Sequence, residues 1–520
     1  MAASQHRRPG THWFVSDGYI WDDHPISSRR EGGRPLECSS RLFLYNPQAR
    51  PAAVTVRLFH VDREPTVVAV TVAAGCIEQI ELAALPEVPH RQAFWITVES
   101  DIPILPQARH EDFTFWDPVP DAMVSVAPYP GPLEDETNWM FIDCFQGDCG
   151  SWYERESISI LNPSPEPAII RVRYLFRLDA GGAEEKITIP GRRVAFLHGE
   201  DRFPRLMGIQ NGPAVRLRWE YNVRIDADRP VIAQSTRRAR WVGFPSIIGS
   251  RSTMAVPVRP DWPDRWHYPG GEIVDYGLLP RPREDTHPLN QCDNTWDLLF
   301  IANPRDDRPA QARLTIHKPD GGSLAAEPMT VPPNKSVLQC LHAKPWLGPF
   351  TRIGEPFAMT VTGDGPLAPS VCGAEFEMWS QVCPGAMTAV NFHPGPLTDE
   401  TAWWLGIGQA GGADTANVEW QQSYHLFNPG DRPVRAKLSF LGLDGPESSP
   451  LTFPVSLAAE AVVRIRSEDV PRLPMGQPFA VKAEGDGPFC AQVFGRAFAR
   501  GLPHSRSMYS FIGVPMGLKR

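Results

Sequence analysis

A fourfold internal repeat is the feature that most constrains how this chain folds. Each copy opens with a tryptophan that starts an apolar strand, and an Asn-Pro pair follows the end of a later strand. The tryptophans are Trp13, Trp139, Trp266 and Trp403, and the asparagines are Asn46, Asn162, Asn303 and Asn428. Self-similarity at a regular period means that one structural unit recurs along the chain, so the fold of one copy predicts the fold of all four.

Two further anchors follow in the same order in every copy. An Asp-x-Pro turn lies 55, 66, 61 and 58 residues after the asparagine, and a methionine lies 22, 26, 23 and 22 residues after the aspartate. The aspartates are Asp101, Asp228, Asp364 and Asp486, and the methionines are Met123, Met254, Met387 and Met508. These anchors divide the chain into four predicted domains, residues 10–132, 133–260, 261–396 and 397–517, which we call repeats 1 to 4.

The four copies fall into two kinds. The junction 128–137 before repeat 2 closely matches the junction 393–401 before repeat 4. Repeats 1 and 3 place the asparagine 33 and 37 residues after the opening tryptophan, whereas repeats 2 and 4 need only 23 and 25. The sequence therefore predicts a duplicated pair in the order A, B, A′, B′, and the chemistry of A and B need not be the same.

Each repeat reads as a set of short β-strands. The chain holds 55 prolines and 42 glycines among 520 residues, which disfavours long helices because both residues cost helix stability. Val54, Val56 and Leu58 alternate with more polar residues, the period of a strand with one buried face. The segment 94–105 reads as a hairpin that turns at Asp101. We predict an all-β protein of four tandem β-sandwich, jelly-roll-like domains.

Bulk properties exclude several classes of function. With 51 Lys and Arg against 60 Asp and Glu, the formal net charge is −9, so we expect no nucleic-acid binding. No run of 18 apolar residues is present, and the first ten residues lack an apolar stretch, so we expect neither membrane insertion nor a secretory signal. Nine irregularly spaced cysteines suggest a reducing compartment, and we expect a cytoplasmic protein.

Repeat 1 resembles a known family. The resemblance rests on residues 13–20, the Asp-Arg-Glu-Pro run 62–65, residues 99–104 with the following Gln107 and Arg109, and the Ala-Pro-Tyr-Pro run 127–130. These motifs are similar to those of the Anabaena sensory rhodopsin transducer family. The resemblance is weaker in repeats 2 to 4, where the Asp-Arg-Glu-Pro run is replaced by glycine-containing turns.

The resemblance implies a soluble β-sandwich that assembles as a fourfold ring, in a superfamily proposed to bind small molecules such as sugars. Four fused copies would then build a pseudo-fourfold ring from one chain, a monomeric pseudo-tetramer in which association has become intramolecular. Fusion also allows each copy to diverge.

The strand after the Asp-x-Pro turn is the predicted binding surface. A polar side chain recurs six residues beyond each aspartate, in an otherwise apolar strand, and arginines lie nearby in three repeats. The polar residues are Gln107, Gln234, Ser370 and Gln492, and the arginines are Arg109, Arg237 and Arg496. Amide groups can both donate to and accept from ligand hydroxyls, and guanidinium groups suit a carboxylate. Alternatively, the polar residues satisfy a neighbouring loop or a contact between repeats, and the arginines lie on a solvated strand face.

Aromatic residues offer a second candidate surface. Trp116 and Trp379 lie 15 residues after their aspartates, and Trp241 lies 13 residues after its own. Flat aromatic faces stack on sugar rings, although such residues also dominate protein cores and interfaces. In repeat 1, His60 and Arg63 form a further polar candidate beside Asp62, or else a solvated hairpin tip.

No catalytic, cofactor-binding or metal-binding motif is found in the sequence. The Cys144 and Cys149 pair has no second pair to complete a zinc site. We therefore expect no cofactor, no metal and no catalytic residue. The leading hypothesis is a non-catalytic protein that binds a small polar metabolite such as a sugar or sugar acid. The alternative is a scaffold or signal-transducing adaptor that binds another protein.

Overall fold

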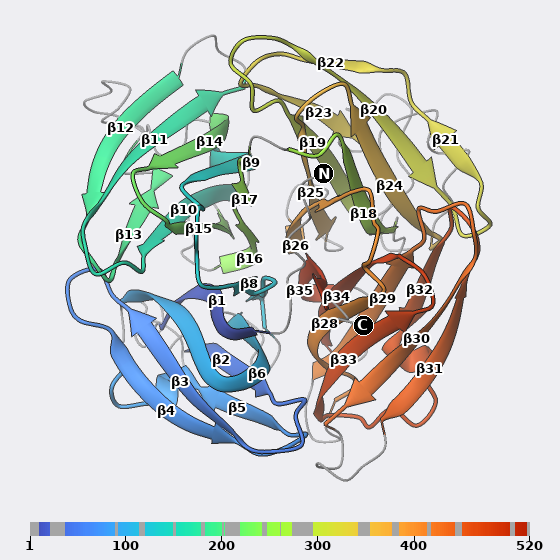
Figure 1. The fold of residues 1–520 in the computed structure, drawn as a ribbon, viewed down its shortest axis with the longest axis horizontal. Coiled ribbons are helices and arrows are strands. Elements are labelled where there is room, and N and C mark those ends of the chain that lie inside the picture. Colours follow the sequence, from blue (N-terminus) through green and yellow to red (C-terminus); the bar gives the residue numbers. More distant parts are fainter. Residues whose placement is uncertain are drawn as a thin grey trace. The chain divides into compact units, whose positions relative to one another are not determined.

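The computed structural model describes residues 10–20, 37–88, 92–113, 120–148, 152–177, 182–199, 202, 219–241, 247–259, 262–272, 295–341, 354–376, 384–412, 418–442, 450–499 and 505–516. The chain forms two compact units, an N-terminal unit that ends at Arg259 and a C-terminal unit that begins at Pro260. Repeats 1 and 2, blue to green in Figure 1, belong to the first unit. Repeats 3 and 4, yellow to red, belong to the second.

Repeat 1 consists of two antiparallel sheets. Its elements are β1 (Gly10–Tyr19), β2 (Glu37–Tyr45), β3 (Ala52–Phe59), β4 (Thr66–Val72), β5 (Ile77–Glu81), a short 3-10 helix η2 (Leu82–Ala84), β6 (Ala93–Phe113), β7 (Ala122–Val124) and β8 (Tyr129–Pro130). The first sheet has the order β4-β3-β6-β1-β8, and the second has the order β5-β2-β6-β7. The long strand β6 takes part in both sheets.

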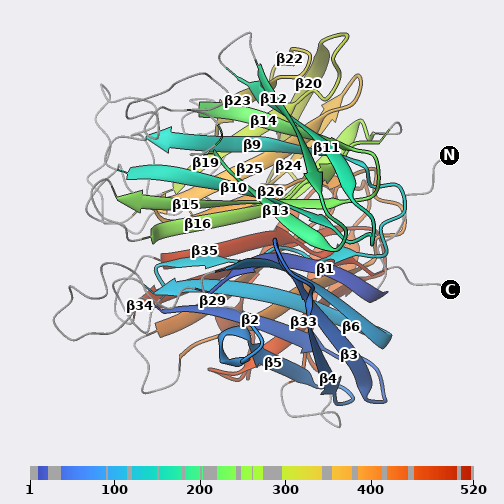
Figure 2. The same cartoon turned by 90° about the vertical axis from the view of Figure 1, so that its left-hand side faces the viewer.

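Repeat 2 has the same order of strands. Its elements are β9 (Asn138–Asp148), β10 (Trp152–Asn162), β11 (Ala168–Phe176), β12 (Gly182–Ile189), β13 (Arg193–His198), β14 (Trp219–Ala227), β15 (Ile232–Trp241), β16 (Ile247–Met254) and β17 (Val256–Pro257). The first sheet runs β12-β11-β14-β9-β17 and the second β13-β10-β15-β16, and β9 also pairs with β10. Figure 2 shows β9, β10, β15 and β16 side by side.

Repeat 3 differs from repeat 2 mainly in its outer hairpin. Its strands are β18 (Arg265–Glu272), β19 (Thr295–Ala302), β20 (Ala310–His317), β21 (Ser323–Ala325), β22 (Met329–Val331), β23 (Ser336–Cys340), β24 (Pro356–Gly363), β25 (Ala368–Phe376), β26 (Pro384–Asn391) and β27 (His393–Pro394). The first sheet runs β21-β20-β24-β18-β27, with β22 also paired to β20, and the second runs β23-β19-β25-β26.

Repeat 4 returns to the pattern of repeat 2. Its elements are β28 (Ala402–Gln409), β29 (Val418–Phe427), β30 (Val434–Leu441), β31 (Leu451–Leu457), β32 (Val462–Arg466), the 3-10 helix η5 (Ser467–Asp469), β33 (Pro478–Gly485), β34 (Cys490–Ala499), β35 (Ser505–Ile512) and β36 (Val514–Pro515). The two sheets run β31-β30-β33-β28-β36 and β32-β29-β34-β35.

The prediction of an all-β sandwich is confirmed. In repeat 2, Ile160 of the second sheet shares one hydrophobic core with Val172 and Val223 of the first, as facing sheets require. Strand β11 alternates buried and more exposed residues along its length, which is the period expected of a sheet with one covered face. Among the described residues, no helix is long and apolar enough to cross a membrane.

The predicted hairpin at Asp101 is wrong. Residues 94–105 lie within β6, whose first half pairs with β1 and β3 and whose second half pairs with β2. The other repeats interrupt this path at the Asp-x-Pro, so that β14 and β15 join different sheets instead of pairing with each other. The Asp-x-Pro turn therefore carries the chain from one sheet to the other.

The recurring asparagines hold the same turn in each repeat. The Asn162 side-chain amide donates hydrogen bonds to the carbonyls of Glu166 (2.8 Å) and Ile189 (3.1 Å), and its oxygen accepts from the Ser164 amide at 3.1 Å. Equivalent bonds are made by Asn46, Asn303 and Asn428. All four side chains are buried. The anchor is a structural device that ties the turn to the end of another strand.

The recurring tryptophans and aspartates are structural as well. The Trp139 indole donates to the carbonyls of Glu136 (3.2 Å) and Val231 (2.7 Å), and Trp13 and Trp403 make equivalent pairs of bonds. Asp228 accepts from the Ile169 amide at 2.9 Å, and the other three aspartates accept from the corresponding amide. In repeat 3, Trp266 donates to the Pro263 carbonyl and Trp262 donates to the Leu367 carbonyl. The aspartate contact is thus shared by all four copies, and the pair of indole bonds by three.

The methionine anchor is wrong in one repeat. Met123 pairs across the strand with Glu111, four residues after Gln107, and Met387 and Met508 occupy the matching register in their repeats. In repeat 2 that position is held by Ser250, and Met254 lies opposite Gln234 instead. The larger spacing of 26 residues in repeat 2 reflects this shift.

The described residues of each unit include an apolar contact between its two repeats. Phe14, Phe59 and Trp95 of repeat 1 join the hydrophobic core that includes Leu161 and Val194 of repeat 2. In the C-terminal unit, Ala358 of repeat 3 packs with Phe427 and Val462 of repeat 4. Cross-strand register makes Ala358 the counterpart of Trp95, and Phe427 the counterpart of Leu161. The same surface therefore joins A to B and A′ to B′.

Candidate functional site

One register position in the second sheet carries polar residues in every repeat. The residue six before the anchor asparagine lies opposite the residue nine after the anchor aspartate. We call these two residues the cross-strand pair. The pairs are Ser40 with His110, Glu156 with Arg237, Asp297 with Gly373, and Gln422 with Gly495. The same place in the fold thus offers different chemistry in each repeat.

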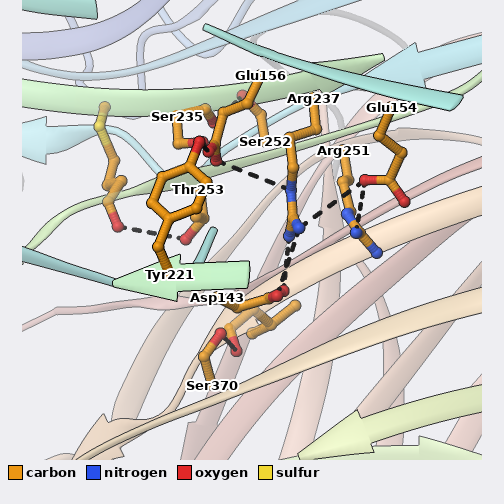
Figure 3. A network of polar contacts seen from close by, with 12 residues as sticks. Asp143, Glu154, Glu156, Tyr221, Ser235, Arg237, Arg251, Ser252, Thr253 and Ser370 are labelled. Carbon is orange, nitrogen blue, oxygen red and sulfur yellow. Dashed lines mark hydrogen bonds and ion pairs between the residues drawn. The ribbon is translucent and has the colours of Figure 1, made fainter. Parts of the chain in front are cut away.

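The pair of repeat 2 belongs to a buried ion cluster, which consists of Asp143, Glu154, Glu156, Arg237 and Arg251 (Figure 3). Arg237 donates to Asp143 at 2.6 Å and also lies 3.8 Å from Glu154 and 4.0 Å from Glu156. Arg251 donates to Glu154 at 2.7 Å. Each of the five residues is at most 7% exposed. Three carboxylates and two guanidinium groups are therefore held together away from water.

Hydroxyl groups complete the cluster. Ser235 donates to Glu156 at 2.6 Å, and the Tyr221 hydroxyl also donates to Glu156. Asp143 lies near the end of β9, and Arg237 lies near the end of β15. Glu154 and Arg251 lie near the starts of β10 and β16, respectively. The ion cluster thus lies at one end of the sandwich, beyond the apolar centre formed by residues such as Ile160.

Burial dominates the electrostatics of this cluster. Burial raises the pKa of Glu156 above its ordinary value, although Arg237, Ser235 and Tyr221 each favour the ionised form. Burial and the charge of Glu156 also raise the pKa of Tyr221 and of the neighbouring Cys144. The phenol and the thiol therefore keep their protons at neutral pH, and Cys144 is not poised as a thiolate nucleophile.

Repeats 1 and 3 place other groups at the same position. In repeat 1, Ser40 Oγ lies 2.7 Å from His110 Nδ1, and His110 Nε2 lies 3.2 Å from Asp112. In repeat 3, burial followed by the charge of Glu375 raises the pKa of Asp297 to about 7. Gly373 opposite Asp297 supplies no side chain, so the basic partner present in repeats 1 and 2 is missing from this pair.

The comparison with known families supports the resemblance seen in the sequence. Residues 9–129 match the family model described as Anabaena sensory rhodopsin transducer. The match therefore covers nearly all of repeat 1. The match ends before repeat 2 and therefore leaves the ion cluster outside it. No curated protein sequence matches the chain.

Solved structures give weaker likenesses. A Thermotoga maritima protein, 1070, is 24% identical over 23% of this chain and 92% of its own, with a TM-score of 0.18. The Anabaena sensory rhodopsin transducer is 23% identical over 20% of this chain and 98% of its own, with a TM-score of 0.16. A tetra-tandem repeat of a large adhesion protein covers 91% of this chain and 94% of its own at 9% identity and a TM-score of 0.10. No functional argument rests on scores this low.

In repeats 1, 2 and 4, the predicted glutamine forms a hydrogen bond to a serine of the same repeat. Gln107 donates to Ser125 at 3.0 Å, and Gln234 and Gln492 donate to the equivalent Ser252 (2.9 Å) and Ser510 (2.8 Å). Each serine in turn donates to the carbonyl of the residue after its glutamine. In repeat 3, the Ser370 hydroxyl donates to the Val390 carbonyl at 3.1 Å. All four predicted residues are buried.

Gln234 also makes a contact between repeats, as does Gln492, which hydrogen-bonds to Tyr268 of repeat 3. Gln234 donates to Asp17 of repeat 1 at 2.6 Å, and Ser159 donates to the same carboxylate at 2.9 Å. Gln234 thus joins the two repeats of the N-terminal unit. These bonds correspond to the alternative interpretation of the glutamines, in which they serve a contact between repeats.

The three predicted arginines have different surroundings. Arg109 pairs with Glu111 at 2.7 Å and lies over the Phe43 ring. Arg496 of repeat 4 pairs with Glu375 of repeat 3 at 3.0 Å. Arg237 lies in the ion cluster, an odd number of residues from Gln234, so the two point to opposite faces of β15. The structure therefore does not bring Gln234 and Arg237 together.

The aromatic and repeat 1 candidates are only partly described. Trp116 and Trp379 lie outside the described residues, and Trp241 is described only as the last residue of β15. His60 is buried, with Nε2 2.9 Å from Thr66 Oγ1, and burial lowers its pKa to about 4. Arg63 is exposed in the turn before β4. His60 and Arg63 therefore differ sharply in burial.

Sequence reasoning missed four members of the ion cluster, Asp143, Glu154, Glu156 and Arg251. A signal was present, because Glu154 and Glu156 alternate along the strand that leads to the anchor asparagine. Strand period places both on one face, and the apolar residues Ile158 and Ile160 continue that face into the core. Two carboxylates on the core-facing side of a strand mark a polar site.

Proposed function

We propose that the protein is a non-catalytic binding protein for a small polar metabolite, a sugar or sugar acid, and that the ion cluster of repeat 2 binds it. The observation that carries this proposal is the burial of two arginines and three carboxylates around a cross-strand pair whose polar side chains differ in every repeat. A position that varies in chemistry on a constant fold is what divergent ligand recognition requires.

The energetics support a functional role for the cluster. Buried ion pairs add little net stability to a protein, because the cost of desolvation offsets their attraction. Apolar residues of similar volume often stabilise the folded protein by at least as much. Groups with strongly shifted pKa values gather at functional sites more often than elsewhere. The proposal explains why repeat 2 keeps charges inside its sandwich.

The chemistry of the cluster suits a polyhydroxylated ligand. Carboxylates accept hydrogen bonds and guanidinium groups donate them, whereas each sugar hydroxyl does both. The two guanidinium groups also provide planar donors for the carboxylate of a sugar acid. Because Arg237 and Arg251 each have a carboxylate partner, we assign them to binding and not to proton transfer.

Thermal-shift screening with sugars, sugar acids and other small metabolites tests the proposal. A ligand at 100 times its Kd stabilises the bound form by about 2.7 kcal/mol, which gives a readily measured rise in Tm. Wild type is compared with the variant Glu154→Gln/Arg251→Gln, which removes one buried pair as a unit. We expect a ligand that raises the Tm of wild type and not of the variant, and failure of the whole panel to raise the Tm would count against the proposal.

A scaffold or signal-adaptor function is the second candidate. It is favoured by the bonds of Gln234 to Asp17, which show a predicted ligand residue used to join repeats. Capture of one specific protein that competes with no small molecule would support it. In either case we expect a particle of one chain, 57.9 kDa, in light scattering.

A further inference from the structure

Three buried histidines lie at the contact between repeats 3 and 4 of the C-terminal unit. His267 and His317 of repeat 3 and His425 of repeat 4 are each at most 6% exposed and lie where the two repeats meet. His267 and His317 both contact the Phe427 ring, with ring centroids 5.9 and 4.8 Å apart, respectively. Phe427 is the repeat 4 side of the apolar contact described above.

Two of these histidines share one hydroxyl group. Thr360 Oγ1 lies 3.3 Å from His267 Nδ1 and 3.1 Å from His317 Nε2. A hydroxyl has one proton to donate and can accept from the other ring, so the arrangement satisfies two neutral imidazoles. Two imidazolium ions at the same positions would place like charges beside one threonine inside an apolar contact.

The charged side chains that act on His267 and His425 are arginines. The charged side chain that acts on His267 is Arg265, and those that act on His425 are Arg464, Arg496 and Arg466. Glu272 accepts from Arg464 and Arg466, and Glu375 accepts from Arg496. His317 receives a contact from the backbone of Glu460. The charges around His267 and His425 are therefore positive and oppose their protonation, whereas burial is what opposes the protonation of His317.

The N-terminal unit is a built-in comparison. The register and the spacing from the anchors make Phe14 the counterpart of His267, Phe59 of His317, and Ser159 of His425. None of these three residues titrates near neutral pH. These three positions of the contact are thus held by non-titrating residues in one unit and by histidines in the other.

We propose that the contact between repeats 3 and 4 is an acid-sensitive joint, which loosens when His267 and His317 take up protons. Opening of the joint lets both imidazoles become charged in water, away from Arg265 and from each other. Loss of their bonds to Thr360 and of their packing on Phe427 then separates β18 and β24 from β29.

The direction of the pH effect follows from burial. Burial lowers the pKa of His267 to about 3 and of His317 to about 4, from 6.5 for a free histidine. The open form therefore binds more protons, so the joint is stable above pH 6.5 and weakens as the pH falls toward 4. Each histidine contributes up to about a tenfold increase in the opening constant per pH unit in that range.

Hydrogen exchange of the full chain at pH 7, 6 and 5, corrected for the intrinsic pH dependence of amide exchange, tests the joint. We expect protection in β24 and β29 of wild type to fall by more than tenfold between pH 7 and 5. In the variant His267→Asn/His317→Gln it should fall by less than threefold. His60→Gln, at a buried histidine of the N-terminal unit, is the matched control and should leave β24 and β29 as in wild type.

Equal loss of protection in wild type and the double variant would overturn the proposal, as would protection in β24 and β29 that does not change with pH. If the double variant does not fold, the single variant His317→Gln decides the matter. Its protection should fall by about half as many decades as that of wild type, and an unchanged fall would contradict the joint.

Discussion

At the scale of single residues, the anchors are explained by hydrogen bonds that only one side chain can make. Asparagine at the Asn-Pro position both donates to strand carbonyls and accepts from a turn amide. Aspartate would lose the donor, and alanine would lose both. The sequence could predict the turns from Asn-Pro and Asp-x-Pro, because those residue types favour turns locally. It could not predict the distant carbonyl partners.

Replacement of a single anchor asparagine should be costly. We expect Asn162→Ala to lower the free energy of unfolding by about 2–4 kcal/mol, because the carbonyl of Glu166 and the buried carbonyl of Ile189 lose their donor. Asn162→Asp should cost a similar amount, since it keeps only the acceptor. Ser164→Ala, at a less buried turn residue, should cost below about 1 kcal/mol. Urea unfolding measures all three, and a neutral Asn162→Ala would contradict this assignment.

Asp297 should make stability depend on pH. Its pKa rises from 3.8 to about 7 on folding, so the folded form binds more protons, and stability is lost as the pH rises from 4 to 7. We expect Asp297→Asn to stabilise the protein by between about 1 and 4 kcal/mol at pH 8 and by almost nothing at pH 3.5. Denaturant midpoints at the two pH values test this, and a gain that is equal at both would refute it.

At the scale of strands, local signals predicted the elements better than their partners. Alternation of Val54, Val56 and Leu58 identified β3 correctly. The hairpin at Asp101 was wrong because a turn signal says that the chain bends and not which sheet the next strand joins. Met254 was misassigned because the sequence shows the methionine but not the residue opposite it. A shift of register along β16 places Met254 opposite Gln234 instead of Arg238.

Gln234 should matter more to stability than Gln107. Both donate to a serine of the neighbouring strand, but Gln234 also donates to Asp17 across the repeat contact. We expect Gln234→Ala to cost about 2–4 kcal/mol and Gln107→Ala about 1–2 kcal/mol. Chemical unfolding of the two variants gives the comparison. If both lost the same amount, the bond to Asp17 would contribute nothing.

An exchange of residues between the two units tests the equivalence of their contacts. Asp17 and Ser159 in the N-terminal unit correspond to Gly270 and His425 in the C-terminal unit, and a Cβ on Gly270 would lie 2.7 Å from the His425 ring. We expect Gly270→Asp alone to destabilise by about 2 kcal/mol or more. Combined with His425→Ser, it should cost less than the sum of the two single variants by about 2 kcal/mol.

The gain in the double variant arises because the new carboxylate can accept from the new hydroxyl and from Gln492, as Asp17 accepts from Ser159 and Gln234. A double-mutant cycle from urea midpoints gives the coupling. Strict additivity of the two substitutions would mean that the two contacts are not equivalent.

At the scale of the whole molecule, the internal repeat predicted that the chain consists of four sandwich domains. It did not predict the location of the ion cluster. The periodic anchors predicted four sandwiches because they mark turns, and turns have characteristic residue types that can be read from the sequence. The ion cluster was missed because sequence reasoning assigns charges to the wet face of a strand. Glu154, Glu156 and Arg251 lie on the covered face, a placement that requires partners supplied by other strands.

The four cross-strand pairs also bear on how the copies diverged. The pairs occupy the same place in the fold but have no chemistry in common. They are Ser40 with His110, Glu156 with Arg237, Asp297 with Gly373, and Gln422 with Gly495. On this account, a ligand that binds through two guanidinium groups and three carboxylates has one site per chain, in repeat 2.

Isothermal titration of the full chain with the strongest thermal-shift ligand tests the central claim most directly. The account predicts one ligand bound per chain and an affinity at least tenfold lower in Glu154→Gln/Arg251→Gln. Gln107→Ala, outside the ion cluster, should leave the affinity unchanged. Unaltered binding by the double variant, or four equivalent sites per chain, would contradict the assignment of the ion cluster as the binding site.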